Sequence, residues 1–433
     1  MNSSLSLCLP RPIAILFWLG VALPAYFGVG SGDSGGGIAL AAAPPKLQIN
    51  KNNADTPQPE RVMVFPTIET AAKFALLVDY STGAVMLDKG GNDRLYPSSM
   101  TKMMTAYLVL DRLQKGSLKL SDSFMVSDNA WRKGGAMTDS STMFLPPNRP
   151  ATVEDLIQGV IVQSGNDASI ALAEGLSGSE SAFVGEMNAK AAEFGMKDSH
   201  FTNSTGIPDK QHYSTARDLA ILSWHTIHDH PEYYHYYGQR RFAYNRHDQE
   251  NRNRLLFEGG TGVDGLKTGH TEISGYGIAV TSLRNGRRLV LVVNGLPSMQ
   301  LRASESKKLL NWGYAQFDNY TIAAAGDQLA LADVWQGQKN TVGLVAKSAV
   351  VVTLPRQSRD YVKLTVNYNG PLIAPIAAGA EVASLTVSAP GVDDSVFPLL
   401  VAESVPQLGW FKRMGWQLSE VFTRMINRAW PAQ

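Results

Sequence analysis

The feature that most constrains the fold is a long stretch of helical periodicity with strand hairpins on both sides. Before it, ALLVDYSTGAVML at 75–87 has two short apolar runs around an S-T-G turn, which is a hairpin pattern. After it, GYGIAVTSLRNGRRLVLVVNGL contains the dipeptide N-G, typical of tight two-residue turns. A closing helix is predicted over ASESKKLLNWGYAQF. This order of elements predicts an α+β domain, in which an antiparallel sheet has helices on both faces.

A second pattern begins near residue 320, where short apolar or alternating runs are separated by Gly, Pro and Asn. Such runs predict a small all-β sandwich domain at 320–402. A chain of 433 residues is longer than one hydrophobic core usually serves, so more than one domain is expected. We therefore place the α+β domain at 65–319, after a polar, Pro-rich linker at 44–64.

The N-terminus has the pattern of an export signal. Arg11 precedes the apolar run IAILFWLGVALPAYFGVG, and small residues in IALAAAP fit an A-x-A cleavage site. We expect a signal peptide at 1–43, with an uncleaved membrane anchor as the alternative. The only cysteine is Cys8, so the exported portion would contain none. A disulfide, a zinc–thiolate site and a thiol nucleophile are thereby excluded from that portion.

The C-terminal segment, 403–433, is predicted to form an amphipathic helix. Its apolar residues recur at spacings of three and four, which places them on one helical face. Basic residues and tryptophans accompany this face, a combination that favours a membrane surface. They are Lys412, Arg413, Arg424 and Arg428, against Glu420 alone, with Trp410, Trp416 and Trp430. We therefore expect a membrane-surface helix; the alternative is an ordinary helix that packs its apolar stripe on a domain.

Three short motifs suggest the chemistry. The spacing S-x-x-K occurs at Ser99–Lys102 and again at Ser304–Lys307, so the spacing alone does not identify a catalytic pair. After the first match, S-x-N follows at Ser164–Asn166 and K-T-G at Lys267–Gly269. The three motifs in this order are typical of serine acyl-transfer enzymes. Ser304–Lys307 follows the K-T-G, so its order fails, and a second S-x-N at Ser127–Asn129 is interpreted as a helix cap.

The first motif offers a nucleophile and its base. A serine hydroxyl reacts poorly until a base takes its proton, and Lys102 lies at i+3 from Ser99 on one helix face. Burial would lower the lysine pKa and leave the amine partly neutral, as a general base requires. Because Pro97 and Ser98 place Ser99 at a helix N-terminus, its backbone N–H is free to stabilise an oxyanion.

The other two motifs suit the remaining steps. Ser164 can pass a proton to the leaving amine, and Asn166 can hold a peptide carbonyl. Lys267 supplies positive charge, and Thr268 a hydrogen-bond donor, for an anionic substrate terminus. The net charge of the chain is only +1, so nucleic acid is not expected as a partner.

On these motifs, together with VDYSTGAVML, VDGLKTGHT, STARDLA and ESKKLLNWGYAQF, the sequence resembles the low-molecular-mass penicillin-binding D-alanyl-D-alanine carboxypeptidases of the bacterial envelope, the peptidase S11 family. The resemblance runs from about Phe65 to the C-terminus. It implies a penicillin-binding, β-lactamase-like transpeptidase domain with a helical subdomain, then the β-sandwich and the terminal helix. It also implies that Ser99 is acylated and that Lys102 is its base.

The resemblance assigns further residues to substrate binding. Gly269 completes the K-T-G, and the His270 backbone N–H would be the second oxyanion donor. Arg217 and Arg302 occupy family arginine positions that support the cleft or meet the substrate carboxylate. The expected reaction removes the terminal D-alanine from peptidoglycan stem pentapeptides, and β-lactam antibiotics are expected to acylate the same serine. A role in cell-wall biogenesis and cell shape is implied, at the periplasmic face of the bacterial inner membrane, with no cofactor or metal.

Other activities use the same motifs. A D,D-endopeptidase that cuts peptidoglycan crosslinks shares the three motifs, and the residues alone do not separate it from a carboxypeptidase. A β-lactamase is less favoured. One major class of β-lactamase deacylates the adduct with a glutamate near an E-x-x-N stretch, and the match in this chain, ENRN at 250–253, lies too close before Lys267. A non-catalytic scaffold is disfavoured by the intact motifs.

Overall fold

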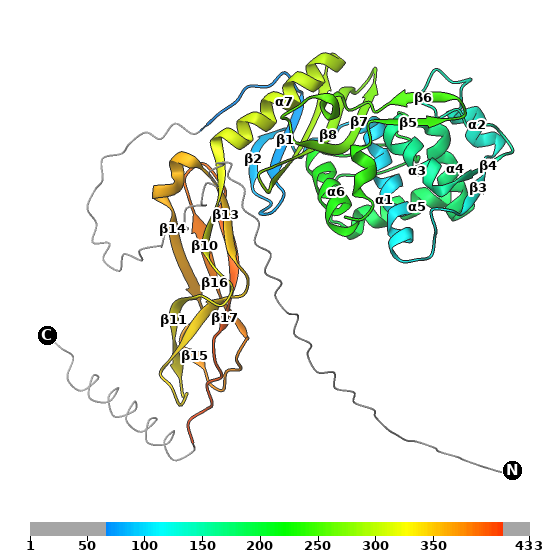
Figure 1. The fold of residues 1–433 in the computed structure, drawn as a ribbon. Coiled ribbons are helices and arrows are strands. Elements are labelled where there is room, and N and C mark those ends of the chain that lie inside the picture. Colours follow the sequence, from blue (N-terminus) through cyan, green and yellow to red (C-terminus); the bar gives the residue numbers. More distant parts are fainter. Residues whose placement is uncertain (1–65, 410–433) are drawn as a thin grey trace, which may run out of the picture. The chain divides into compact units, whose positions relative to one another are not determined.

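The computed structural model describes residues 66–409 (Figure 1). The predicted signal peptide at 1–43, the linker at 44–64 and residues 410–433 of the predicted terminal helix lie outside the described residues. Among residues 66–409, no helix is both long enough and apolar enough to cross a bilayer.

Five antiparallel strands form the central sheet, in the spatial order β2-β1-β9-β8-β7. Their bounds are Phe74–Asp79 for β1, Val85–Lys89 for β2, Val263–Thr271 for β7, Gly275–Arg284 for β8 and Arg287–Leu296 for β9. Helix α7 (Met299–Gln316) packs on β8 and β9, and α6 (Ala216–Asp229) packs on β9 and β1. Figure 1 shows these helices on opposite faces of the sheet. The predicted α+β architecture is confirmed.

The sheet separates two hydrophobic cores, because successive side chains of a strand point to opposite faces. In β9, Leu289, Leu291 and Val293 pack with buried residues of α7. Val290 and Val292 belong to the second core, with residues of the helical region. Both faces are apolar because both are covered, and the central strands are therefore almost continuously hydrophobic.

Helices and short strands between β2 and β7 form the helical region of the α+β domain. The elements that precede α6 are η1 (Ser98–Thr101), α1 (Lys102–Gln114), β3 (Ser123–Met125), α2 (Asp128–Gly134), β4 (Pro150–Thr152), α3 (Val153–Gln158), η2 (Gly159–Gln163), α4 (Asn166–Ser177) and α5 (Glu180–Glu193). Those that follow α6 are η3 (Tyr234–Gly238), β5 (Arg241–Tyr244), β6 (His247–Glu250) and η4 (Arg254–Phe257). Ser127 caps α2, and its Oγ accepts the Ala130 N–H, as expected for the second S-x-N.

The C-terminal part of the described chain is an all-β domain. Its strands are β10 (Phe317–Ala323), β11 (Gln328–Trp335), β12 (Thr341–Ala346), β13 (Val350–Pro355), β14 (Lys363–Tyr368), β15 (Leu372–Ile373), β16 (Glu381–Ser388) and β17 (Ser395–Val401), with the turn η5 (Arg356–Tyr361). They form a six-stranded sheet and the pair β10-β13, whose side chains share one core. Strand β10 begins directly after α7, three residues before the predicted boundary at 320.

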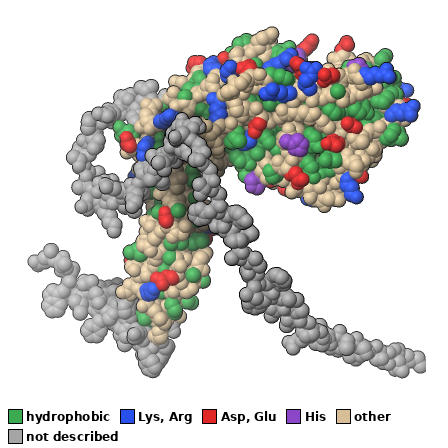
Figure 2. Space-filling view, in the orientation of Figure 1, with side chains coloured by type: hydrophobic (Ala, Val, Ile, Leu, Met, Phe, Trp, Pro, Cys, Tyr) green, Lys and Arg blue, Asp and Glu red, His purple; other side chains and the backbone are tan. Residues whose placement is uncertain are grey.

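Charged side chains of both signs are interspersed on the visible face of the α+β domain (Figure 2). This distribution agrees with a net charge of only +1 for the chain. The candidate chemistry must therefore depend on a local arrangement of charge.

Candidate active site

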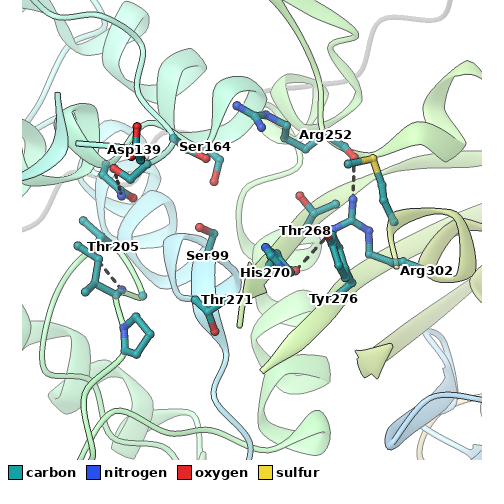
Figure 3. A pocket seen from close by; sticks show the side chains of 18 residues that line it. Ser99, Asp139, Ser164, Thr205, Arg252, Thr268, His270, Thr271, Tyr276 and Arg302 are labelled. Atoms are coloured by element: carbon teal, nitrogen blue, oxygen red, sulfur yellow. Dashed lines mark hydrogen bonds between the residues drawn. The ribbon is translucent and has the colours of Figure 1, made fainter. Parts of the chain in front are cut away.

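A cleft of about 400 Å³ lies along β7 and is lined from both walls. Figure 3 shows Ser99 near its centre, with Ser164 on one side and the arginines Arg252 and Arg302 together at one end. Thr205 lies toward the other end (Figure 3). The structure thus brings the S-x-x-K, S-x-N and K-T-G motifs to one site.

Ser99 lies in η1, the 3₁₀ turn that leads into α1. Ser98, immediately before it, has a positive φ of 49°, a conformation that non-glycine residues rarely adopt and that recurs at functional sites. The turn also packs tightly against its neighbours. A Cβ at Gly206 would lie 1.8 Å from Ser98 O, and a Cβ at Gly269 would lie 2.8 Å from Pro97 O. Glycine at both positions lets two backbone segments approach the nucleophile.

Lys102 is only 1% exposed beside Ser99. Its Nζ donates to Asn166 Oδ1 and to Thr205 O, each at 2.6 Å, and lies 3.1 Å from Ser99 Oγ. Burial lowers the pKa of Lys102 to about 7, although the nearby Asp167 carboxylate opposes this shift. In the neutral amine, the two N–H bonds can point to the two close acceptors. The lone pair is then left for the Ser99 hydroxyl.

Ser164 lies at the end of the π-helical turn η2, with a left-handed backbone at φ 61°. Turns of this kind are frequent at functional sites because they re-aim a side chain. Ser164 is 3% exposed, and its Oγ makes no hydrogen bond within residues 66–409. The hydroxyl is therefore free to bond a substrate group.

Asp167 follows the S-x-N motif and fixes the segment 142–145 behind it. Its buried carboxylate accepts a hydrogen bond from Thr142 Oγ1 at 2.6 Å. It also accepts hydrogen bonds from the backbone N–H groups of Met143 and Leu145, both at 3.0 Å. Asp167 was not among the residues predicted from the sequence, although an acidic side chain next to S-x-N and in the first turn of a predicted helix was a visible signal.

Strand β7 carries the K-T-G motif into the cleft. Lys267 is 2% exposed, and its Nζ donates only a long bond to Thr268 O, at 3.3 Å, among the described residues. Burial, reinforced by neighbouring cationic groups, lowers the pKa of Lys267 well below its usual value. Thr268 lines the cleft, and the ring of His270 stacks on Tyr276 with 3.8 Å between centroids.

Two arginines complete a cationic end of the cleft. Arg302, on α7, is 5% exposed, and its Nη2 donates to the Arg252 carbonyl at 3.2 Å. Burial lowers the pKa of Arg302 to about 10, so the guanidinium remains charged at neutral pH. Arg302 was predicted from the sequence, whereas Arg252, which lines the same cleft, was not. With Lys267, these residues form a site for an anionic group.

The structure does not bring Arg217 to the cleft, so its predicted substrate contact is corrected. Its Nη2 pairs with Asp88 at 2.6 Å, and its Nε donates to Asn92 Oδ1 at 2.7 Å. The side chain is about a third exposed and lies at the start of α6. Acceptors at the end of β2 and just after it hold this guanidinium, so Arg217 ties the start of α6 to this neighbouring segment.

Comparisons with known proteins identify the family. The family described as D-alanyl-D-alanine carboxypeptidase, peptidase S11, matches residues 58–298, and the C-terminal domain of penicillin-binding protein 5 matches 317–407. The chain is 38% identical over 348 residues to the D-alanyl-D-alanine carboxypeptidase DacA of Haemophilus influenzae, covering 80% of this chain and 88% of that protein. The chain belongs to the D-alanyl-D-alanine carboxypeptidase family.

Further relatives of this carboxypeptidase agree. It is 37% identical over 357 residues to the D-alanyl-D-alanine carboxypeptidase DacC of Escherichia coli, covering 82% of this chain and 89% of that protein. The crystal structure of penicillin-binding protein 5 from Haemophilus influenzae matches with a TM-score of 0.73 at 38% identity, over 80% of this chain and 100% of that chain. The predicted activity, that of a serine-type D-alanyl-D-alanine carboxypeptidase, is confirmed, and so is the fold of an S11 domain followed by a β domain.

Proposed function

We propose that this carboxypeptidase removes the terminal D-alanine from peptidoglycan stem pentapeptides through an acyl-enzyme on Ser99. The observation that carries the proposal is the buried amine of Lys102, which lies 3.1 Å from Ser99 Oγ and has two other close acceptors. A cationic end of the cleft, formed by Arg252 and Arg302, supports a substrate with a free carboxylate.

In the first half-reaction, neutral Lys102 takes the proton of Ser99 as Oγ attacks the carbonyl carbon of the penultimate D-alanine. The backbone N–H groups of Ser99 and His270 hold the oxyanion. The C–N bond then breaks as Lys102 returns its proton, relayed through Ser164, to the nitrogen of the departing D-alanine, which leaves Lys102 neutral again. In the second half-reaction, Lys102 deprotonates a water that attacks the ester, and Ser99 regains its proton.

The carboxylate of the departing D-alanine is placed at the cationic end. Thr268 donates a hydrogen bond to it, and Lys267 and Arg302 neutralise its charge, with Arg252 as a further partner. Buried cations without an anion are costly, so a bound carboxylate relieves the repulsion among them. Asn166 remains available to bond the peptide through its side-chain amide.

Penicillins present a carboxylate and a strained amide in the geometry of D-alanyl-D-alanine, and we infer that they acylate Ser99 as well. The name of the matched structure, penicillin-binding protein 5, supports this inference. Fluorescent penicillin should label the protein, and Ser99→Ala should abolish both labelling and D-alanine release. Ser304→Ala is the matched control, because Ser304 belongs to the S-x-x-K on α7 and should leave both readouts unchanged. Labelling that persists in Ser99→Ala would place the nucleophile elsewhere.

Release of D-alanine from a stem pentapeptide, compared with cleavage of a crosslinked dimer, separates carboxypeptidase from endopeptidase activity. We expect D-alanine release to dominate. A faster cut of the dimer would contradict the proposed substrate.

Residues 403–409 are not helical, and they pair with the β domain through Val405 and Gln407, so the predicted start of the terminal helix at 403 is corrected. We propose that export by the segment 1–43 and a membrane-surface helix within 410–433 bring the protein to the periplasmic face of the inner membrane. The basic residues and tryptophans of the terminal segment support this. Deletion of 410–433 should reduce cosedimentation with anionic phospholipid vesicles and leave penicillin labelling intact. The deletion spares Val405, because this residue is buried in the β domain and pairs with Ile376. Undiminished cosedimentation of the shortened chain would contradict the anchor.

A further inference from the structure

The cleft has a direction that the structure defines. Strand β7 is the edge of the five-stranded sheet and pairs only with β8, so an extended peptide can align along its free edge. Figure 3 shows Arg252 and Arg302 at one end of the cleft, and Thr205 and Thr271 away from them. If the terminal carboxylate binds at the arginines, as in the proposed function on which this inference rests, the amino-terminal part of the peptide leaves past Thr271.

A second hollow, of about 550 Å³, begins where the peptide would leave. It is lined by Tyr96, Pro208, Asp209, Lys210, Gln211 and Ile273, and we call it the 208–211 groove. Pro208 lines both the cleft and the groove, so the two adjoin at this residue. Ser98 Oγ lies 2.7 Å from Ser274 Oγ, which ties the segment beside Tyr96 to the turn that carries Ile273.

The groove combines an apolar wall with two opposite charges. Ile273 is 68% exposed, a large exposed fraction for an isoleucine. Asp209 and Lys210 are exposed, and neither forms an ion pair with another described residue. Asp209 Oδ1 accepts the Gln211 N–H at 2.7 Å, which holds the turn, while the rest of the carboxylate remains open to a ligand.

We propose that the 208–211 groove binds the side chain of the stem residue that directly precedes the D-alanyl-D-alanine pair. Asp209 and Lys210 recognise a diamino dicarboxylic acid, whose side chain ends in an ammonium and a carboxylate. Asp209 pairs with the ammonium, Lys210 pairs with the carboxylate, and Ile273 contacts the methylene stem. Each residue of an extended peptide spans about 3.3 Å, so a long side chain placed one residue beyond the acylated D-alanine can reach an adjoining groove.

The test measures kcat/KM for D-alanine release from three peptides that differ only at this residue. The residues are meso-diaminopimelate, lysine and norleucine, which present an ammonium with a carboxylate, an ammonium alone, and neither. Exposed ion pairs contribute little, so the advantage expected from each charge is about two- to fivefold. The order of rates should be diaminopimelate, lysine, norleucine, and the differences should shrink at high salt.

Two charge-removing variants assign each contact. Asp209→Asn keeps the oxygen that holds the turn, and it should remove the advantage of lysine over norleucine. Lys210→Gln should remove the advantage of diaminopimelate over lysine. Asp360→Asn and Lys363→Gln, exposed charges of the β domain, are the matched controls and should preserve both advantages.

An N-acyl-D-alanyl-D-alanine substrate, which lacks the preceding residue, separates the two proposals. If it is cleaved and the three peptides react at equal rates, the groove assignment is overturned and the proposed function stands. Preferences that persist in both variants also overturn the assignment to Asp209 and Lys210. If no substrate releases D-alanine, the proposed function itself fails.

Discussion

A single protonation equilibrium, that of Lys102, controls the proposed chemistry at the residue scale. Two acceptors lie 2.6 Å from its Nζ and favour the ammonium ion, whereas burial favours the neutral amine. Burial is the larger effect and lowers the pKa to about 7. The amine is therefore partly neutral under ordinary conditions, whereas an exposed lysine would be almost fully protonated.

The acylation rate should follow the neutral fraction of Lys102. Because the protonated amine cannot accept the Ser99 proton, the rate of labelling by fluorescent penicillin should fall about tenfold per pH unit well below pH 7 and level off above about pH 8. Rapid-quench measurements between pH 5 and pH 9 provide the check. A rate that is flat across this range would mean that Lys102 is not the base.

At the element scale, the side chain of His212 acts as a clamp: it joins η1, the turn that carries Ser99, to the segment 202–206. His212 Nδ1 accepts the Thr202 N–H at 3.1 Å, so the ring proton is on Nε2, which donates to Thr101 Oγ1 at 2.8 Å. His212 is 1% exposed, and burial lowers its pKa to about 4. The clamp therefore requires the neutral imidazole, and the segment that it holds supplies the Thr205 carbonyl to Lys102.

Replacement of this imidazole, His212→Leu, should cost about 1–3 kcal/mol of unfolding free energy at pH 7.5, because two buried polar groups lose their partner. The cost should depend on pH. The folded-state pKa of His212 is depressed, so stability is lost from the parent as pH falls from about 6.5 to about 4, while the variant has no such group. The stability advantage of the parent over the variant should therefore fall by about 3 kcal/mol over this range, so that near pH 4 the variant is at least as stable as the parent.

Urea unfolding at several pH values measures this difference, and His235→Leu, a change at an exposed histidine, is the control. A pH-independent difference would show that His212 does not titrate with folding. The other charged groups that face His212 are Asp209, His200 and Lys102.

The sequence predicted those parts of the site whose chemistry depends on side-chain type and order. Ser99, Lys102 and Ser164 were found because their motifs are ordered along the chain, and the structure brings them together. The Thr205 carbonyl was not predictable, because every residue has a backbone carbonyl and only the fold selects one. Arg252 was missed for a similar reason: its arginine-rich neighbourhood gives no sign of which guanidinium faces the cleft. Arg217 was misplaced because the sequence does not show that Asp88 lies beside it.

The same distinction applies to the elements. Hairpin and helix patterns predicted the α+β sheet and the β domain, because alternation and periodicity are local properties. The left-handed turn at Ser164 and the positive φ at Ser98 were not predicted, since tertiary contacts hold both residues against their local preference.

On the scale of the whole molecule, the two parts of the described chain have separate cores. The buried core residues of the β domain all lie at 323–405, and those of the α+β domain all lie at 72–317. Each part has a hydrophobic core of its own, as expected of an independent folding unit.

A fragment of residues 44–317 should therefore fold and be acylated. It retains Phe317, which packs with α7 in the α+β domain, and it should react with fluorescent penicillin within about twofold of the rate of the full chain. The same fragment with Ser99→Ala should remain unlabelled. A fragment that is soluble but does not react would show that the β domain is needed to form the cleft.

The three groups that contact the amine of Lys102 belong to segments that are 3, 64 and 103 residues away in the chain. Only the completed tertiary structure can assemble them, and a denatured or misassembled polypeptide would keep an ordinary, unreactive hydroxyl. A fluorescent antibiotic can thus serve as a reporter of correctly assembled molecules, which counts native copies in a crude extract where an antibody against a linear epitope would count every copy.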